Sequence, residues 1–202
     1  MKLHRRDVVS ELLRDRGELL VVAGLGSTAW DITAAGDHDL SFPTWGAMGQ
    51  AAMIGLGLAL AQPERRVLVV TGDGEMLMGM GSLATIGVQQ PKNLTVVVID
   101  NERYGETGMQ RTHTAHGVDL AAVALGCKIP NAITVSGDLG PVRQMIYERA
   151  GPNFAAIKVS DEKLPLVLPP KDGVLLKARF RRALLGAIDD PATSADVLPE
   201  ER

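Results

Sequence analysis

The sequence predicts a three-layer α/β fold, in which a doubly wound and mostly parallel sheet carries helices on both faces. Two short apolar runs rich in β-branched residues, 67–71 and 94–99, are typical of strands buried in a parallel sheet. The segment between them is long enough for a crossover helix, so the two strands can be parallel neighbours. Small apolar residues dominate 46–61, which indicates a helix buried against that sheet.

The other elements follow from the same signals along the chain. Apolar residues at helical spacing predict a helix over 3–16, and an apolar run predicts a strand over 19–23. Polar residues and glycines predict a loop over 36–45 and a mobile loop over 102–117 that lies above the site. Further helices are expected at 81–90, 119–125, 141–149 and 174–185, and further strands at 132–135 and 155–159. We expect a single domain over 1–187, and the polar segment 188–202 is expected to be a disordered tail.

Composition excludes several classes of protein. The 202 residues carry a net charge of −3 without a basic cluster, which argues against a nucleic-acid surface. No apolar stretch reaches the ~18 residues that a membrane-spanning helix needs. Cys127 is the only cysteine, so neither an intrachain disulfide nor a cysteine-held iron–sulfur cluster can form. A cytoplasmic location is the default expectation.

Polar residues follow both diagnostic strands at the point where each strand ends. Gly72, Asp73 and Gly74 follow the first strand, and Asn101 follows the second. The carboxyl ends of parallel strands meet at one edge of the sheet, where open α/β folds bind ligands. A carboxylate and a carboxamide at that edge suit Mg²⁺, whose remaining ligands are commonly phosphate oxygens and water. The sequence therefore predicts a site for a divalent cation and a phosphate group.

This pattern resembles the diphosphate-binding motif of thiamine-diphosphate enzymes. Segments 24–28 and 45–49 are also similar to glycine-rich segments of that family, with Ala47 in place of a serine. The similarity is closest to the cofactor-binding half of sulfopyruvate and phosphonopyruvate decarboxylases. It implies thiamine diphosphate and Mg²⁺ as cofactors and the decarboxylation of a 2-oxo acid, with an anionic pyruvate analogue as the first choice of substrate.

The resemblance also implies roles for individual residues. Asp73, Asn101 and the backbone carbonyl of Arg103 would hold Mg²⁺. The backbone of Gly46 and Met48 would pair with the aminopyrimidine ring, and Met48 would hold the cofactor in the bent shape that its chemistry requires. The cofactor-binding set is Gly26, Ser27, Thr28, Gly46, Met48, Gly72, Asp73, Gly74, Glu75 and Asn101.

Two features depart from the family pattern. Glu75 follows Gly74 where many relatives have a small hydroxyl residue, so its carboxylate must point away from the diphosphate or find a cation. The glutamate that activates the pyrimidine ring lies in a separate domain of the family, and this chain has no room for that domain. The resemblance therefore implies a partner subunit of roughly similar size that carries the glutamate.

Several assignments and functions stay open. Met48, His113 and His116 are the candidate catalytic residues, the two histidines as proton donors or anion contacts. Arg111 could hold a substrate sulfonate, phosphonate or carboxylate, and His38 has a weaker claim to the site. The alternative functions are a carboligase subunit similar to acetolactate synthase, an oxidative decarboxylase subunit, and a non-catalytic homologue that serves as an assembly module.

Overall fold

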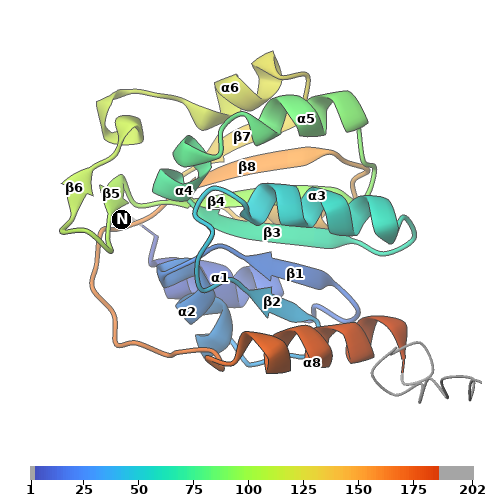
Figure 1. Cartoon of the computed structure of the whole chain (residues 1–202). Helices are drawn as coiled ribbons and strands as arrows, with labels where there is room; N and C mark the ends of the chain where they lie inside the picture. The colour runs from blue at the N-terminus through green and yellow to red at the C-terminus, as the bar shows by residue number, and fades with distance from the viewer. Residues whose placement is uncertain (1–2, 187–202) are drawn as a thin grey trace, which may run out of the picture.

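The computed structural model describes residues 3–186, and these residues build one parallel sheet with helices on both faces (Figure 1). The strand order is β2-β1-β3-β4-β8-β7, and every neighbouring pair is parallel. The strands are β1 (Leu20–Ala23), β2 (Ser41–Pro43), β3 (Val67–Gly72), β4 (Leu94–Asp100), β7 (Asn131–Val135) and β8 (Asn153–Lys158). The predicted three-layer α/β fold is confirmed, with a main sheet that is parallel throughout.

Two separate hydrophobic cores lie on the two faces of this sheet. One core contains residues of α1 (Arg5–Leu13), α2 (Ser27–Ala34) and α7 (Gly140–Tyr147). The other contains residues of α3 (Ala51–Ala61), α5 (Ser82–Gln89), α6 (Leu120–Gly126) and α8 (Gly173–Leu185). Along β1, Leu20 and Val22 join the second core whereas Val21 and Ala23 join the first. Because both faces of β1, β3 and β4 are buried, the sequences of these strands are almost entirely apolar.

The connections diverge between strands β1 and β3, which are neighbours in the sheet. After β1 the chain passes through α2 to β2, and after β3 it passes through α4 (Asp73–Met78) and α5 to β4. Because β2 and β4 lie on opposite sides of the β1–β3 pair, the carboxyl ends of β1 and β3 form a topological switch point. Open α/β sheets bind their ligands at such a point.

Two predicted loops contain regular structure, so those predictions were wrong in part. Segment 36–45 includes β2, which is only three residues long and forms because it pairs with β1. Segment 102–117 contains a hairpin of β5 (Arg103–Tyr104) and β6 (Gln110–Arg111), followed by a 3₁₀ turn over His113–His116. Elements this short carry too few residues for a periodic pattern.

Several predicted helices have different ends in the structure. The helix predicted over 46–61 begins only at Ala51, because Ala47 and Gly49 have φ values of +57° and +88° that a right-handed helix excludes. The helix predicted over 3–16 spans Arg5–Leu13. The tail expected over 188–202 lies outside the described residues.

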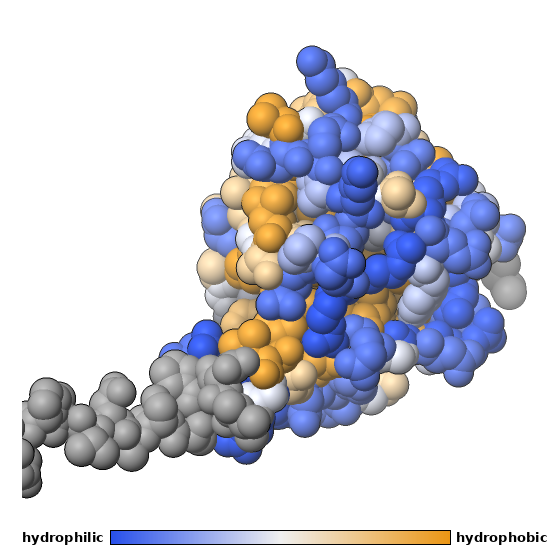
Figure 2. All heavy atoms as spheres, turned by 90° about the vertical axis from the view of Figure 1, so that its right-hand side faces the viewer, coloured by the Kyte–Doolittle hydropathy of each residue, from blue (hydrophilic) through white to orange (hydrophobic). Residues whose placement is uncertain are grey.

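The amino ends of the strands form a surface of mixed character. Figure 2 shows hydrophilic residues there, interspersed with apolar patches. Within residues 3–186, no helix combines the length and the apolar character needed to cross a bilayer.

Candidate active site

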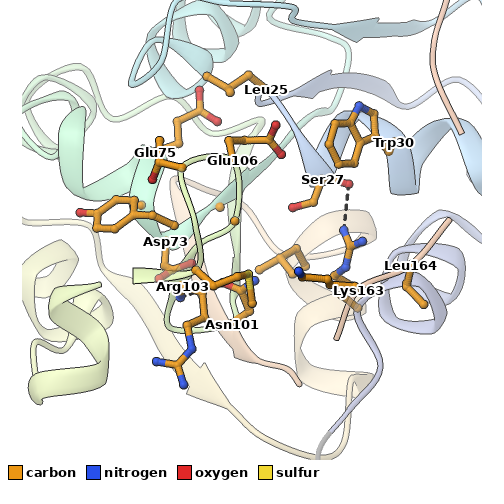
Figure 3. Close-up of a pocket in the computed structure, with 18 of the residues that line it drawn as sticks. Leu25, Ser27, Trp30, Asp73, Glu75, Asn101, Arg103, Glu106, Lys163 and Leu164 are labelled. Atoms are coloured by element: carbon orange, nitrogen blue, oxygen red, sulfur yellow. Dashed lines mark hydrogen bonds between the residues drawn. The ribbon is translucent and has the colours of Figure 1, made fainter. Parts of the chain in front are cut away.

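A cavity of about 380 Å³ lies at the carboxyl ends of the central strands, where the switch point is (Figure 3). Its volume is in the range of small-molecule sites. The predicted site residues that line it are Ser27, Met48, Gly72, Asp73, Gly74, Glu75, Asn101 and Arg103. The structure thus brings together segments that are distant in the sequence, at the edge of the sheet where the ligand was expected.

Asp73 is held at the first residue of α4, directly after β3. The register pairs Gly72 with Ile99 and Asp100 with Lys158, so Asp73 follows the last paired residue of β3 and Asn101 follows that of β4. The Asp73 side chain is buried and accepts a hydrogen bond of 2.6 Å from the Thr112 hydroxyl. Burial raises the pKa of Asp73 to about 6, and the Thr112 bond opposes this rise. A carboxylate removed from water in this way gains strongly from a bound cation.

Asn101, and not the preceding Asp100, lines the cavity. Asp100 is already paired, because Lys158 Nζ lies 2.8 Å from one carboxylate oxygen and the Thr114 hydroxyl donates to the other at 2.8 Å. The Asn101 Oδ1 accepts a hydrogen bond of 3.0 Å from the backbone N–H of Arg103. This bond fixes the Asn101 side chain and leaves its oxygen a second lone pair for a metal ion.

Glu75 points toward Leu25, away from Asn101 and Arg103 (Figure 3). The Thr71 hydroxyl donates to Glu75 Oε2 at 2.8 Å, and burial raises the pKa of the Glu75 carboxyl. A Cβ on Gly24 would lie only 1.8 Å from the same oxygen, so glycine is required there for Glu75 to pack. The departure at Glu75 is therefore accommodated by burial against the 24–25 turn, without an ion pair to a described cation.

Met48 reaches the cavity because two glycines let neighbouring segments approach closely. A Cβ on Gly79, at the end of α4, would lie 2.0 Å from the carbonyl oxygen of Gly49. The indole Nε1 of Trp45 also donates to the carbonyl of Pro170 at 2.8 Å. The first contact holds the segment that precedes α3 against the end of α4, and the second ties it to the stretch before α8. Met48, between them, lies on the cavity wall.

The first turn of α2 is anchored by a buried ion pair. The Arg5 guanidinium lies 2.7 Å from Asp31 Oδ2 and donates to the Ser27 carbonyl at 3.3 Å, a bond drawn in Figure 3. The exposed fractions of Arg5 and Asp31 are 4% and 0%. Burial raises the pKa of Asp31, although Arg5 and Arg6 oppose this rise. The pair thereby ties α1 to α2 and keeps Ser27 at the cavity.

Replacement of Arg5 by methionine should lower the free energy of unfolding by about 3 kcal/mol or more, because it leaves the buried Asp31 with Arg6 alone. Denaturant unfolding followed by circular dichroism measures this loss. Arg14→Met is the matched control, since Arg14 pairs with Glu11 on the surface and should change stability by less than about 1 kcal/mol. Equal stability of the Arg5→Met variant and the wild type would contradict the role of this pair.

Other predicted site residues do not line the cavity. The Thr28 hydroxyl donates to the Gly24 carbonyl at 2.8 Å and so stabilises the turn itself. His113 and His116 are exposed on the 3₁₀ turn, and Arg111 is exposed on β6. Gly26 and Gly46 also do not line the cavity, although neighbouring residues in their segments do. His38 does not line it either, and its Nδ1 accepts a hydrogen bond from the Leu40 N–H.

Sequence reasoning missed several residues that line the cavity, among them Arg5, Trp30, Tyr104, Glu106 and Lys163. The Glu106 carboxylate lies against Gly26, where a Cβ would be 3.0 Å from Oε1. The Tyr104 ring fills the space beside Gly74, since a Cβ there would lie 2.6 Å from it. The available signal was position: Tyr104, Glu106 and Lys163 lie in segments that follow the carboxyl ends of β4 and β8.

The fold and this cavity define a doubly wound α/β protein with a cavity at the carboxyl edge of its parallel sheet, where such folds bind ligands. Residues 26–157 match the family described as "Thiamine pyrophosphate enzyme, C-terminal TPP binding domain". The chain belongs to this family of thiamine pyrophosphate enzymes. The resemblance inferred from the sequence is thereby confirmed.

Related sequences support the same assignment. The sulfopyruvate decarboxylase subunit beta of Methanothermobacter thermautotrophicus is 35% identical over 190 residues, which cover 94% of this chain and 100% of the relative. The corresponding subunit of Methanocaldococcus jannaschii is 41% identical over 133 residues, 65% of this chain and 70% of the relative. Phosphonopyruvate decarboxylase of Streptomyces viridochromogenes is 39% identical over 180 residues, 88% of this chain but only 44% of the relative.

A solved structure shows the same fold. Benzoylformate decarboxylase from Polynucleobacter necessarius aligns with a TM-score of 0.65 and 18% sequence identity. The alignment covers 82% of this chain and 35% of that protein.

Proposed function

We propose that this chain is the cofactor-binding subunit of a decarboxylase that depends on thiamine diphosphate and Mg²⁺. Its substrate would be an anionic pyruvate analogue such as sulfopyruvate or phosphonopyruvate, because the relatives described above carry those names. The observation that carries the proposal is the placement of buried Asp73 and of Asn101 on the wall of one cavity.

The residues present fit the cofactor and its metal ion. The side of Gly72 is open, since no atom lies within 4 Å of where its Cβ would be, so a phosphate group can approach the backbone. Among residues 3–186, no group of three His, Cys, Asp or Glu side chains could hold a metal ion. A cation held by Asp73, Asn101 and the Arg103 carbonyl would therefore take its other ligands from the diphosphate and water, as Mg²⁺ commonly does.

The chain's own residues would position the cofactor and exclude water from it. Ser27, at the first turn of α2, would contact the diphosphate. Met48 would support the rings of the cofactor. Bound thiamine diphosphate would supply the electron sink for the carbanion that remains after CO₂ leaves. His113 and His116, both exposed in this chain, would contribute only where a partner brings substrate to their turn.

A partner subunit of roughly similar size is part of the proposal, and it would supply the activating glutamate. The name "subunit beta" of the two sulfopyruvate decarboxylase relatives supports a heteromer. Large apolar side chains are also exposed on α3, on α5 and around α4, as a partner contact would require: Met53, Leu60, Met78, Met80 and Val88. We place the assembled enzyme in the cytoplasm.

Product analysis on the complex purified from its native source tests this function. With thiamine diphosphate and Mg²⁺, we expect CO₂ and an aldehyde from sulfopyruvate or phosphonopyruvate, and slower turnover of pyruvate. Formation of acetolactate from pyruvate as the main product would favour a carboligase instead. Absence of cofactor binding by the complex in calorimetry would favour a non-catalytic assembly module.

A further inference from the structure

Carboxylates outnumber cationic side chains on the cavity wall by four to three, although the expected cofactor is itself an anion. Four carboxylates line the cavity: Asp73, Glu75, Glu106 and Glu162. A diphosphate group would add further negative charge to these four carboxylates. A divalent cation on Asp73 would neutralise only part of that total. A diphosphate therefore needs a further positive charge from the protein.

Three cationic side chains line the cavity, and two of them are already paired. Arg5 is held by Asp31 at 2.7 Å, and the Nε of Arg103 lies 3.2 Å from Asp161 Oδ2. Lys163 is the third, and within residues 3–186 it has no carboxylate oxygen within 4.0 Å. Of the cations that the structure places here, Lys163 is thus the one whose charge is not already balanced.

The segment that carries Lys163 is fixed to the body of the protein on both sides. Before it, the Ser160 N–H donates to the Leu3 carbonyl at 2.9 Å, next to the bridge between Leu3 and Val159. After it, the Arg6 guanidinium donates to the Pro165 carbonyl at 2.8 Å. The position of the Lys163 backbone is therefore set before any ligand arrives, which reduces the entropy lost when the ammonium group binds.

The cavity has a direction that relates Lys163 to the two ends of the cofactor. Met48 precedes α3, which packs on one face of the sheet, whereas Lys163 lies beside the start of α1, which packs on the other. Figure 3 shows Lys163 and Ser27 on one side of the cavity, with Asp73 and Glu75 on the other. A cofactor held at its ring end by Met48 would have both Asp73 and Lys163 on the cavity wall as contacts for its diphosphate.

We propose that Lys163 binds the terminal phosphate of thiamine diphosphate and supplies the positive charge that the divalent cation leaves unbalanced. This inference rests on the proposed function. An ammonium group is well suited to this contact because it acts as a compact point charge toward phosphate oxygens.

Direct binding measurements on the complex, freed of cofactor and metal by dialysis, test this assignment. Calorimetry with saturating Mg²⁺ compares thiamine diphosphate with thiamine monophosphate, which lacks the terminal phosphate. Lys163→Met should weaken thiamine diphosphate about tenfold or more, the loss expected for one charge-assisted contact, and leave the monophosphate within about twofold. Lys163→Arg should retain most of the affinity. Lys171→Met, which removes an exposed lysine outside the cavity, should change neither ligand.

Three results would overturn the assignment. Unchanged thiamine diphosphate affinity in Lys163→Met would remove Lys163 from the cofactor site. If the KM for the 2-oxo acid rose in the same variant, Lys163 would instead be a substrate contact, and the assignment would be overturned as well. An equal loss for both ligands would indicate damage to the whole cavity. If the wild-type complex binds no thiamine diphosphate, the proposed function itself is overturned. If the wild type binds it and Lys163→Met binds it equally well, only the assignment of Lys163 is overturned.

Discussion

Asp73→Asn should abolish Mg²⁺-dependent binding of thiamine diphosphate while the chain remains folded. Asparagine removes the negative charge that the metal ion needs but keeps an oxygen that can accept the 2.6 Å hydrogen bond from Thr112. We expect affinity in the presence of Mg²⁺ to fall by about 100-fold or more, since even outer residues of metal sites cost ~10–100-fold when replaced. Calorimetry of the complex with and without Mg²⁺ measures the loss, and circular dichroism checks the fold.

Asparagine is the sharper substitution because Asp73 is buried. Alanine would leave the Thr112 hydroxyl, which donates to Asp73 Oδ2, without that acceptor and would cost about 1–3 kcal/mol of stability in addition. Asp15→Asn, at an exposed surface aspartate, is the matched control and should bind the cofactor as the wild type does. Unaltered affinity in the Asp73→Asn variant would remove Asp73 from the metal site.

The purified chain alone should show negligible decarboxylase activity, even with thiamine diphosphate and Mg²⁺. The glutamate that activates the cofactor ring is proposed to come from the partner subunit, and loss of such a proton-transfer group typically costs about 10²–10⁴-fold in rate. Release of CO₂ from sulfopyruvate and phosphonopyruvate, measured for the chain alone and for the native complex at equal concentration, checks this result.

Reconstitution separates a missing residue from a merely unstable chain. Addition of the partner to the inactive chain should restore turnover, whereas a partner whose activating glutamate is replaced by glutamine should restore assembly without turnover. Substantial activity of the chain by itself would refute the shared active site.

The metal and diphosphate edge could be predicted because its signal is local. Strands β3 and β4 are buried on both faces, so each is a continuous apolar run, and the polar residues Asp73 and Asn101 follow directly at their carboxyl ends. The parallel pairing then brings those two ends to one edge, which the register of Gly72 with Ile99 confirms. Length and periodicity along the chain were sufficient for this inference.

The direction of individual side chains could not be predicted in the same way. Glu75 adjoins the metal motif in sequence, yet it turns toward the 24–25 turn because Gly24 leaves room for its carboxylate and Thr71 binds it. Arg111 was expected to contact a substrate anion because its segment was interpreted as a loop above the site. In the structure the segment forms the hairpin of β5 and β6, and the Arg111 side chain is exposed and does not line the cavity.

The sequence by itself determined the α/β fold, the two central strands and the polar residues at their ends, because each of these follows from a pattern among neighbouring residues. Only the tertiary structure decided which distant segments complete the cavity. Arg5 reaches it through its buried contact with Asp31 across the α1–α2 interface, and Lys163 through the bonds that hold its segment to residues near the start of the chain. Such positions arise from the packing of segments far apart in sequence, and no local pattern encodes that packing.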